Sequence, residues 1–236
     1  MASAHRQARP ALALLAFLCL AGPAAAETQA IDHYVLSLSW SPSFCLTEAS
    51  TGEALQCDGP RSYAFVLHGL WPQYERESPA YCDTDERFVP AALFEKVRSF
   101  MPSLRLVRHQ WRKHGSCSGL SMTRYFELAA ALFEKVRIPA RYLAPTRPIE
   151  TDATEIETDF AKTNRGLDPD MISLTCSRHK GRARLVDVRI CFTTGGKFTS
   201  CGRKEGQSCE GRNLVLPPLR SARRSTAPDD DPSEMP

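Results

Sequence analysis

The sequence lacks an apolar run long enough to cross a lipid bilayer. Its most hydrophobic stretch, Ala11–Ala21, is shorter than the roughly 20 residues that a membrane-spanning helix needs. Arg6 and Arg9 precede this stretch and small residues follow it up to Ala26, which is typical of a secretory signal peptide. We therefore expect residues 1–26 to be a signal peptide, the protein to be exported to the periplasm or the medium, and no membrane to be among its partners.

The sequence also has little net charge. It contains 30 Lys and Arg residues against 27 Asp and Glu residues, and loss of two arginines with residues 1–26 leaves 28 against 27, a net charge of +1. A charge this small neither indicates nor excludes a polyanionic partner, which only local clustering can reveal.

Cys-x-x-Cys pairs are absent, which argues against a zinc site. Of nine cysteines, Cys19 leaves with the expected signal peptide. The eight that remain are Cys45, Cys57, Cys82, Cys117, Cys176, Cys191, Cys201 and Cys209. In an exported chain they indicate four disulfides, although the sequence alone does not say which cysteines pair.

Three short segments have the patterns of β-strands. Residues 33–40 alternate strictly and predict a half-buried strand, residues 63–67 are continuously apolar and favour an inner strand, and residues 185–192 alternate again. The side chains expected to face inward in the first and third strands are Tyr34, Leu36, Leu38, Trp40, Val186, Val188, Ile190 and Phe192.

Helices are expected between these strands. Pro90 can open one that runs to Met101, Ser121 can cap another that ends before Pro139, and Asp152 can cap a third that stops near Gly166. Because strands and helices mix without regular alternation, we predict an α+β fold in a single disulfide-bonded domain. The domain is expected to span residues 27–216, and residues 217–236, rich in proline and charge, are expected to be disordered.

Residues 107–117, VRHQWRKHGSC, concentrate polar groups on one side of an expected helix over 107–116. At about 100° per residue, His109, Lys113, Gln110 and His114 share roughly 140° of the helix surface. Arg112 lies on the opposite side and Trp111 at the border. A helix that packs on a core would place apolar residues on such a face.

Three interpretations of this face compete. A solvated basic helix end is the simplest, because Lys and His favour a helix C-terminus. A zinc helix would need histidines four residues apart with a glutamate between them, which His109 and His114 do not satisfy. The third is an acid–base site for phosphoryl transfer, in which imidazoles move protons and an ammonium group offsets phosphate charge.

The third interpretation needs a second proton carrier, and the segment FVLHGLWPQY supplies one. His68 is expected to end the apolar strand, and Gly69 to let the chain turn sharply. Trp71 on the following turn could stack against a base. A single histidine after a strand usually has only a structural role, but two histidine-containing segments in one chain favour a functional site.

FVLHGLWP at 65–72 and HQWRKHGSC at 109–117 resemble the two catalytic segments of the ribonuclease T2 family, and DHYVLSLSWSPSFC at 32–45 resembles that family's first strand. The resemblance runs from about Asp32 to Cys209. It implies an antiparallel sheet packed by helices and RNA cleavage without a metal or other cofactor. In that reaction a 2′-hydroxyl attacks the adjacent phosphate, the 5′-oxygen leaves, and a 2′,3′-cyclic phosphate forms.

The resemblance also implies roles for individual residues. His114 would be the general base, His68 the general acid, His109 a phosphate ligand and Lys113 a group that stabilises the transition state. Trp71, and with less support Gln73 and Tyr74, would form a base pocket. The implied disulfides are Cys45–Cys57, Cys82–Cys117, Cys176–Cys209 and Cys191–Cys201.

One position departs from the family pattern, because Gln110 stands where the family normally has Glu. Glutamine keeps hydrogen-bonding atoms but loses the charge, so we expect reduced activity with an altered pH profile. The main alternative is a catalytically weakened RNA-binding or regulatory protein on the same scaffold. A metal-dependent nuclease is disfavoured because the motifs offer no converging carboxylates. We expect a monomer that acts on single-stranded RNA and not on DNA.

Overall fold

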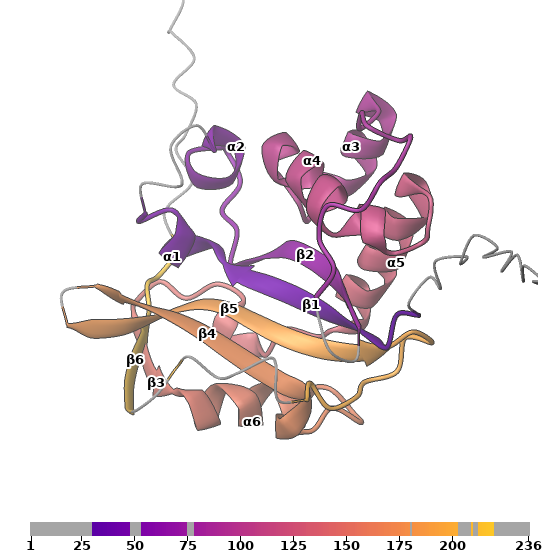
Figure 1. The fold of residues 1–236 in the computed structure, drawn as a ribbon. Helices are drawn as coiled ribbons and strands as arrows, with labels where there is room; N and C mark the ends of the chain where they lie inside the picture. The colour runs from indigo at the N-terminus through magenta and orange to yellow at the C-terminus, as the bar shows by residue number, and fades with distance from the viewer. Residues whose placement is uncertain are drawn as a thin grey trace, which may run out of the picture.

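The computed structural model describes residues 30–47, 53–74, 78–179, 181–202, 209 and 212–219. Six strands form one sheet in the order β2-β1-β5-β6-β3, with β4 paired to β5 (Figure 1). They are β1 (His33–Trp40), β2 (Phe65–Gln73), β3 (Ile149–Asp152), β4 (Ile172–His179), β5 (Arg182–Thr193) and β6 (Arg212–Leu216). The expected signal peptide and residues 220–236 lie outside the described residues.

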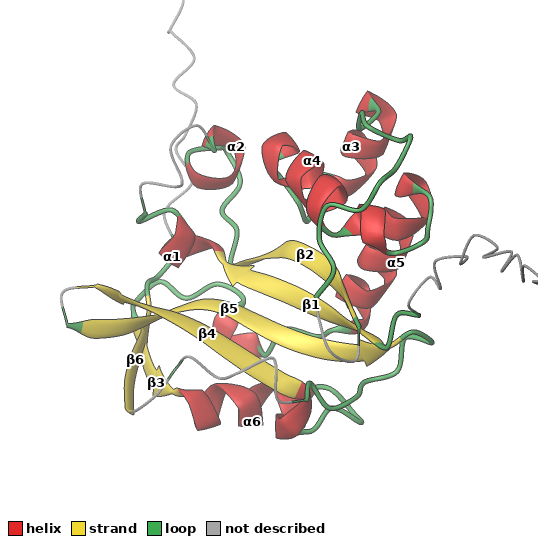
Figure 2. Cartoon of the chain, in the orientation of Figure 1, coloured by secondary structure: helices red, strands yellow, loops and turns green. Residues whose placement is uncertain are grey.

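Helices cover both faces of this sheet. They are α1 (Ser41–Phe44), α2 (Ala54–Cys57), α3 (Ala91–Val97), α4 (Leu104–Lys113), α5 (Met122–Lys135) and α6 (Ala153–Thr163). Short 3₁₀ segments lie at Gly115–Cys117, Ala140–Tyr142 and Pro169–Met171. Helices α3, α4 and α5 lie on one face and α6 on the other (Figure 2), so the α+β prediction is confirmed.

The sheet is mixed rather than wholly antiparallel. Every strand pair is antiparallel except β5 and β6, which run parallel. A parallel neighbour needs a long return connection, and β5 and β6 are well separated in the sequence, from Thr193 to Arg212. The expectation of an antiparallel sheet is therefore wrong at this one pair.

Burial also corrects the predicted character of the first two strands. In β1 the intervening residues Val35 and Ser37 are as buried as the predicted inward face, because both faces of the sheet are covered. The apolar segment expected to be an inner strand belongs to β2, which lies at the edge of the sheet. It is buried by the helices α4 and α5 that contact it rather than by a second neighbouring strand.

A β-bulge in β5 shifts side chains from their predicted faces. Opposite β4, Cys176 pairs with Leu185 and Thr175 with Asp187, so Val186 is the extra residue. Leu185 is consequently buried in the core, and Val186 is only half-buried. A second register shift lies between β3 and β6, and a third lies in β2 and belongs to the site described below.

Helices α3, α5 and α6 begin at the predicted caps, whereas α4 begins earlier than predicted. Ser121 and Asp152 accept hydrogen bonds from the amides of Arg124 and Glu155 as caps of α5 and α6. Helix α4 begins at Leu104, three residues before the predicted start, because the Ser103 hydroxyl caps it by accepting from the Leu106 amide. Helices α3 and α5 end at Val97 and Lys135, short of Met101 and Pro139.

The described chain continues beyond the expected domain boundary at residue 216. The Trp40 indole N–H donates to the Pro217 carbonyl at 3.1 Å, and the Leu219 amide donates to the Pro145 carbonyl at 2.9 Å. Residues 217–219 are thus held against the domain. No helix within the described ranges has the length and apolar character needed to traverse a bilayer.

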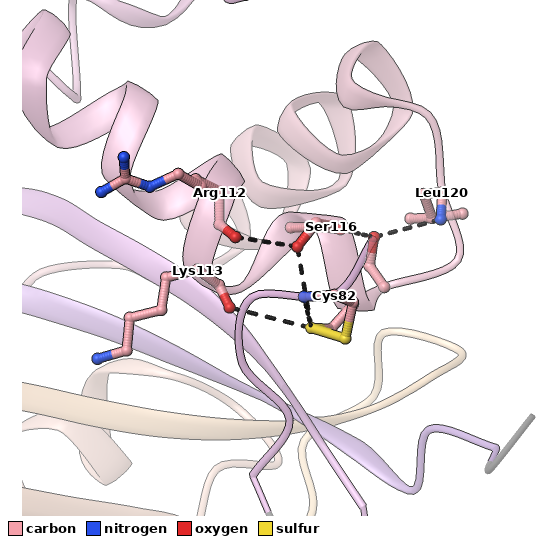
Figure 3. The surroundings of a disulfide bond; sticks show 8 residues. Cys82, Arg112, Lys113, Ser116 and Leu120 are labelled. Atoms are coloured by element: carbon pink, nitrogen blue, oxygen red, sulfur yellow. Dashed lines mark hydrogen bonds between the residues drawn. A yellow bond between two sulfur atoms is a disulfide. The ribbon is translucent and has the colours of Figure 1, made fainter. Parts of the chain in front are cut away.

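All four disulfides implied by the family resemblance are present. Cys82–Cys117 joins the loop after β2 to the turn that follows α4 (Figure 3). Around it, the Tyr81 amide donates to the Lys113 carbonyl at 2.9 Å and the Ser116 hydroxyl donates to the Arg112 carbonyl at 3.0 Å. The C-terminal end of α4 is therefore fixed both covalently and by hydrogen bonds.

We predict that replacing Cys82 and Cys117 together by serine lowers the free energy of unfolding by about 2–4 kcal/mol, because the unfolded chain loses a long closed loop. The matched control is the Cys45→Ser/Cys57→Ser protein, whose loop spans 12 residues instead of 35. Its loss should be smaller by about 1 kcal/mol. Equilibrium unfolding in urea measures both values, and an equal or reversed order would contradict the prediction.

Candidate active site

His68 occupies a β-bulge in β2. Ser37 of β1 pairs with Gly69 and Leu38 pairs with Leu67, so His68 is the extra residue without a partner. Bulges redirect side chains next to functional sites. The strand does not end at His68, as the sequence suggested, but runs on to Gln73.

A buried acid faces the His68 ring. Asp187 of β5 is 3 % exposed, and its Oδ1 lies 3.3 Å from His68 Nδ1. The hydroxyls of Ser39 and Thr175 also donate to this carboxylate, at 2.5 Å and 3.2 Å. Burial alone would raise the pKa of Asp187, but the hydrogen bond and charge of His68 and the Ser39 hydroxyl hold it below its ordinary value. An ionised Asp187 therefore engages Nδ1 of His68 and leaves Nε2 for proton transfer.

Helix α4 brings the four polar residues of the second motif to the same place. His109, Lys113 and His114 are half-buried, whereas Gln110 is 1 % exposed. Trp111, expected at the border of the polar face, is buried, and its indole N–H donates to the Glu86 carbonyl at 2.5 Å. Figure 3 shows the Lys113 side chain extending away from the Cys82–Cys117 disulfide.

The Trp71 indole connects the two motifs. Its ring stacks on His114 with centroids 5.3 Å apart and meets the His68 ring edge-on at 5.4 Å. Its N–H donates to Gln110 Oε1 at 2.9 Å. The guanidinium of Arg189 lies 4.9 Å from the centre of the same ring. The two predicted proton carriers are thus positioned by one aromatic side chain.

Gly69 permits this arrangement by lacking a side chain. A Cβ at this position would lie 2.0 Å from Gln110 Oε1 and 2.7 Å from Trp71 Nε1. The sequence suggested that Gly69 serves a sharp turn, but the backbone continues as a strand. Its role is to let the Gln110 carboxamide approach the strand.

His114 is held in its neutral form. Burial first, and then the nearby charges of Lys113, His109 and His68, lower the pKa of His114 to about 3. Its Nδ1 is buried and has no hydrogen-bond partner among the described residues, so Nε2 is the nitrogen left for chemistry. Burial and neighbouring cations lower the pKa of His109 as well.

A hollow of about 320 Å³ opens beside the histidines, with His68 and His109 in its wall. Phe44, Val66 and Leu106 give it an apolar surface. Ser39, Glu53, Gln56, Ser103 and Arg105 add polar groups around this surface. A flat, partly polar ring is the kind of ligand that such a hollow accommodates.

The residues predicted for base binding lie in different surroundings. Trp71 packs within the site itself. Gln73 is 3 % exposed, and its carboxamide accepts from the Ser78 hydroxyl and donates to the Trp71 carbonyl. Tyr74 is half-buried. The base-binding role of these three residues stays a prediction.

Asp187, Arg189 and the wall of the hollow were not predicted from the sequence. Asp187 and Arg189 alternate with the predicted inward residues of the strand over 185–192, a pattern that suggests a solvent-facing side. Both faces of the sheet are covered, so Asp187 is buried instead. A charged residue inside an apolar strand was the only signal. Among the described residues, no three His, Cys, Asp or Glu side chains converge as a metal site would require.

This chain is similar to known proteins in both sequence and fold. The model of the ribonuclease T2 family matches residues 31–201. A ribonuclease from Aeromonas hydrophila is 41% identical over 204 residues, covering 82% of this chain and 89% of the relative. A probable ribonuclease from Haemophilus influenzae is 33% identical over 126 residues, covering 48% of this chain and 46% of the relative.

Solved structures agree with the fold. The structure of RNase NT with 5′-AMP superimposes with a TM-score of 0.59 at 23% identity, covering 80% of this chain and all of that one. A mutant of RNase MC1 with 5′-UMP gives 0.60 at 22% identity, covering 78% and 97%. Structural similarity at such low sequence identity supports the fold alone. Membership of the family is shown by the sequence matches. The chain therefore belongs to the ribonuclease T2 family.

Proposed function

We propose that this protein cleaves single-stranded RNA by internal attack of a 2′-hydroxyl on the adjacent phosphate. The 2′-oxygen–phosphorus bond forms, the bond from phosphorus to the 5′-oxygen breaks, and a 2′,3′-cyclic phosphate remains. One observation carries the proposal: two imidazoles from different elements, His68 of β2 and His114 at the C-cap of α4, pack against the same Trp71 ring.

The two histidines suit opposite proton transfers. With its pKa lowered to about 3, His114 is unprotonated at any pH above mildly acidic values and can accept the 2′-hydroxyl proton. His68, held at Nδ1 by Asp187, can deliver a proton from Nε2 to the leaving 5′-oxygen. After the step, His114 holds one proton more and His68 one fewer.

The remaining groups serve the phosphate and the base. Lys113 supplies an ammonium group where charge builds on the phosphate oxygens, and His109 borders the same site. The hollow beside His68 and His109 fits a nucleobase. Two relatives of similar fold are known with 5′-AMP and 5′-UMP, which supports a nucleotide ligand here. The chemistry requires no metal ion or other cofactor, because the imidazoles carry both protons.

We also propose that the protein works as a monomer outside the cytoplasm. Its four disulfides are stable in an oxidising compartment such as the periplasm or the medium.

A second function is favoured by one observation. The buried Gln110 replaces a carboxylate in the centre of the site, which suits a protein that binds RNA but cleaves it poorly. The surviving proton carriers His68 and His114 support the enzyme over this alternative.

The deciding experiment incubates the oxidised protein with RNA and with DNA of the same sequence, in EDTA, from acidic to neutral pH. We expect RNA fragments with 2′,3′-cyclic phosphate ends and intact DNA, because DNA lacks the attacking hydroxyl. His68→Ala and His114→Ala should each lower the rate about 10²- to 10⁴-fold. RNA that stays intact at micromolar protein, yet is retained in a binding assay, would establish the RNA-binding function instead.

Gln110→Glu is expected to raise kcat/KM at neutral pH by about threefold to tenfold. A carboxylate close to His114 raises the pKa of that imidazole, which makes it a stronger base. The acidic limb of the pH profile of kcat/KM should therefore move to higher pH. Gln110→Met is the matched control, because it removes the acceptor for the Trp71 N–H without adding charge, and it should lower the rate. An unchanged or lower rate for Gln110→Glu would show that glutamine is no handicap.

Asp187→Asn should lower kcat by about 10- to 100-fold while KM changes less than about threefold. Asparagine keeps the size of the side chain but can present either its oxygen or its NH₂ group to His68 Nδ1, so the ring loses its fixed tautomer. Glu150→Gln, at an exposed acid of β3, is the control of equal charge change. A proportional loss in both variants, or a purely KM effect, would contradict the orienting role of Asp187.

A further inference from the structure

Helix α4 has a third face that the proposed reaction does not use. At about 100° per residue from His109, the apolar residues Leu104, Val107 and Trp111 lie between about 160° and 220°, and Leu106 lies near 60°. The catalytic residues occupy about 0° to 140°. Arg105, Arg108 and Arg112 fall between about 260° and 320°, on the opposite flank of His109 from His114. All three arginines are exposed.

The loop before α3 adds another cation and an aromatic ring to this flank. Arg87 is exposed, and Phe88 is 88% exposed, the most exposed of the large apolar side chains among the described residues. The loop is held against the helices. The Glu86 carbonyl accepts from the Trp111 indole at 2.5 Å, and the Glu86 carboxylate accepts from the Met122 amide at 2.9 Å. Arg87 and Phe88 are therefore positioned beside α4.

These side chains surround a shallow hollow of about 730 Å³. Arg87, Phe88, Arg108 and Arg112 contribute to its lining. Arg105 and His109 line both this hollow and the smaller one beside His68, so the two adjoin each other. Arg105 is engaged by Glu53 at 2.7 Å. Within the described part of the chain, no acidic side chain forms an ion pair with Arg87, Arg108 or Arg112.

We infer that Arg87, Arg108 and Arg112, here called the basic row, together with Phe88, bind the part of the RNA strand that leaves the site past His109. This inference rests on the proposed function and names where a long substrate is held. Arg108 to Arg112 spans about 6 Å along the helix, enough for two phosphates. Guanidinium groups bind phosphate oxygens, and an exposed phenyl ring can stack on any base. The row therefore increases affinity for long RNA without selecting a sequence.

The local cluster of arginines matters because the overall charge of the chain is small. The chain without residues 1–26 carries a net charge of only +1, so the protein as a whole has little attraction for a polyanion. Concentrating cations next to His109 guides the strand into the site. Figure 3 shows the Arg112 side chain directed away from the disulfide that fixes the end of α4.

The test compares Arg108→Gln/Arg112→Gln with Lys162→Gln/Arg165→Gln. The control removes the same charge from exposed residues in and after α6, on the opposite face of the sheet. Two substrates are used: a dinucleotide, which is too short to reach the row, and an RNA of about 20 nucleotides. We expect KM for the long RNA to rise about tenfold in the row variant and to stay unchanged in the control variant. Both variants should cleave the dinucleotide at the rate of the unmodified protein.

Binding of a 2′-deoxy oligonucleotide of the same length separates this inference from the proposed reaction, because such a strand cannot be cleaved by 2′-hydroxyl attack. The slope of log affinity against log salt should become shallower by about 1.4 in the row variant, the value for two lost phosphate contacts on a single strand. Phe88→Ala should weaken binding about tenfold, whereas Leu143→Ala, at another exposed apolar side chain, should not.

Several outcomes would overturn the inference. They are an unchanged salt slope, an equal loss in the Lys162→Gln/Arg165→Gln control, and an equal loss on the dinucleotide and the long RNA. Binding to vesicles of anionic lipid that depends on the row, with RNA affinity unaffected, would assign the row to membranes instead. If no RNA is cut but the row variant still loses salt-dependent binding, the proposed reaction fails and the binding surface stands.

Discussion

Packing of the Trp71 ring is the constraint on which the rest of the site depends. The ring contacts an imidazole from its own strand and another at the C-cap of α4, and its N–H donates to the carboxamide of Gln110. A flat, rigid side chain is well suited to this role, because it fixes two partners at once with little conformational freedom of its own. The strand supplies the ring, and the absence of a side chain at Gly69 lets the helix come close enough to meet it.

Burial then decides which charges the site can hold. Asp187 is almost fully buried, yet it remains ionised because two hydroxyls and the His68 ring satisfy its oxygens. Gln110 is equally buried and carries no charge, so nothing offsets the cations around His114. One histidine thus has a carboxylate partner and the other has none. This asymmetry follows from the low polarity of the interior and gives the two imidazoles different proton-transfer roles in the proposed reaction.

Much of the site could be predicted from the sequence, but its supporting residues could not. His109, Gln110, Lys113 and His114 share a helix face by simple geometry, and Ser121 and Asp152 cap helices where the side-chain pattern indicates. The pairing of cysteines came from family resemblance. Asp187 could not be predicted, because alternation marks it as solvent-facing, whereas it is buried against Ser39, His68 and Thr175 of neighbouring strands. The β-bulges could not be predicted from the sequence either, because they depend on how two distant strands pair.

The bulge in β2 places His68 outside the regular alternation of core residues along the strand. If His68 is skipped, Phe65, Leu67 and Leu70 alternate regularly and all three are buried, so the extra residue leaves the core pattern in phase. Deleting residue 68 alone would therefore restore an unbroken ladder with β1 while keeping every core side chain on its side of the sheet. A single codon lost at this point would remove the imidazole from the site and leave the core intact. Gain of one codon would be the reverse step, by which a sheet of this kind acquires an imidazole without rebuilding its interior.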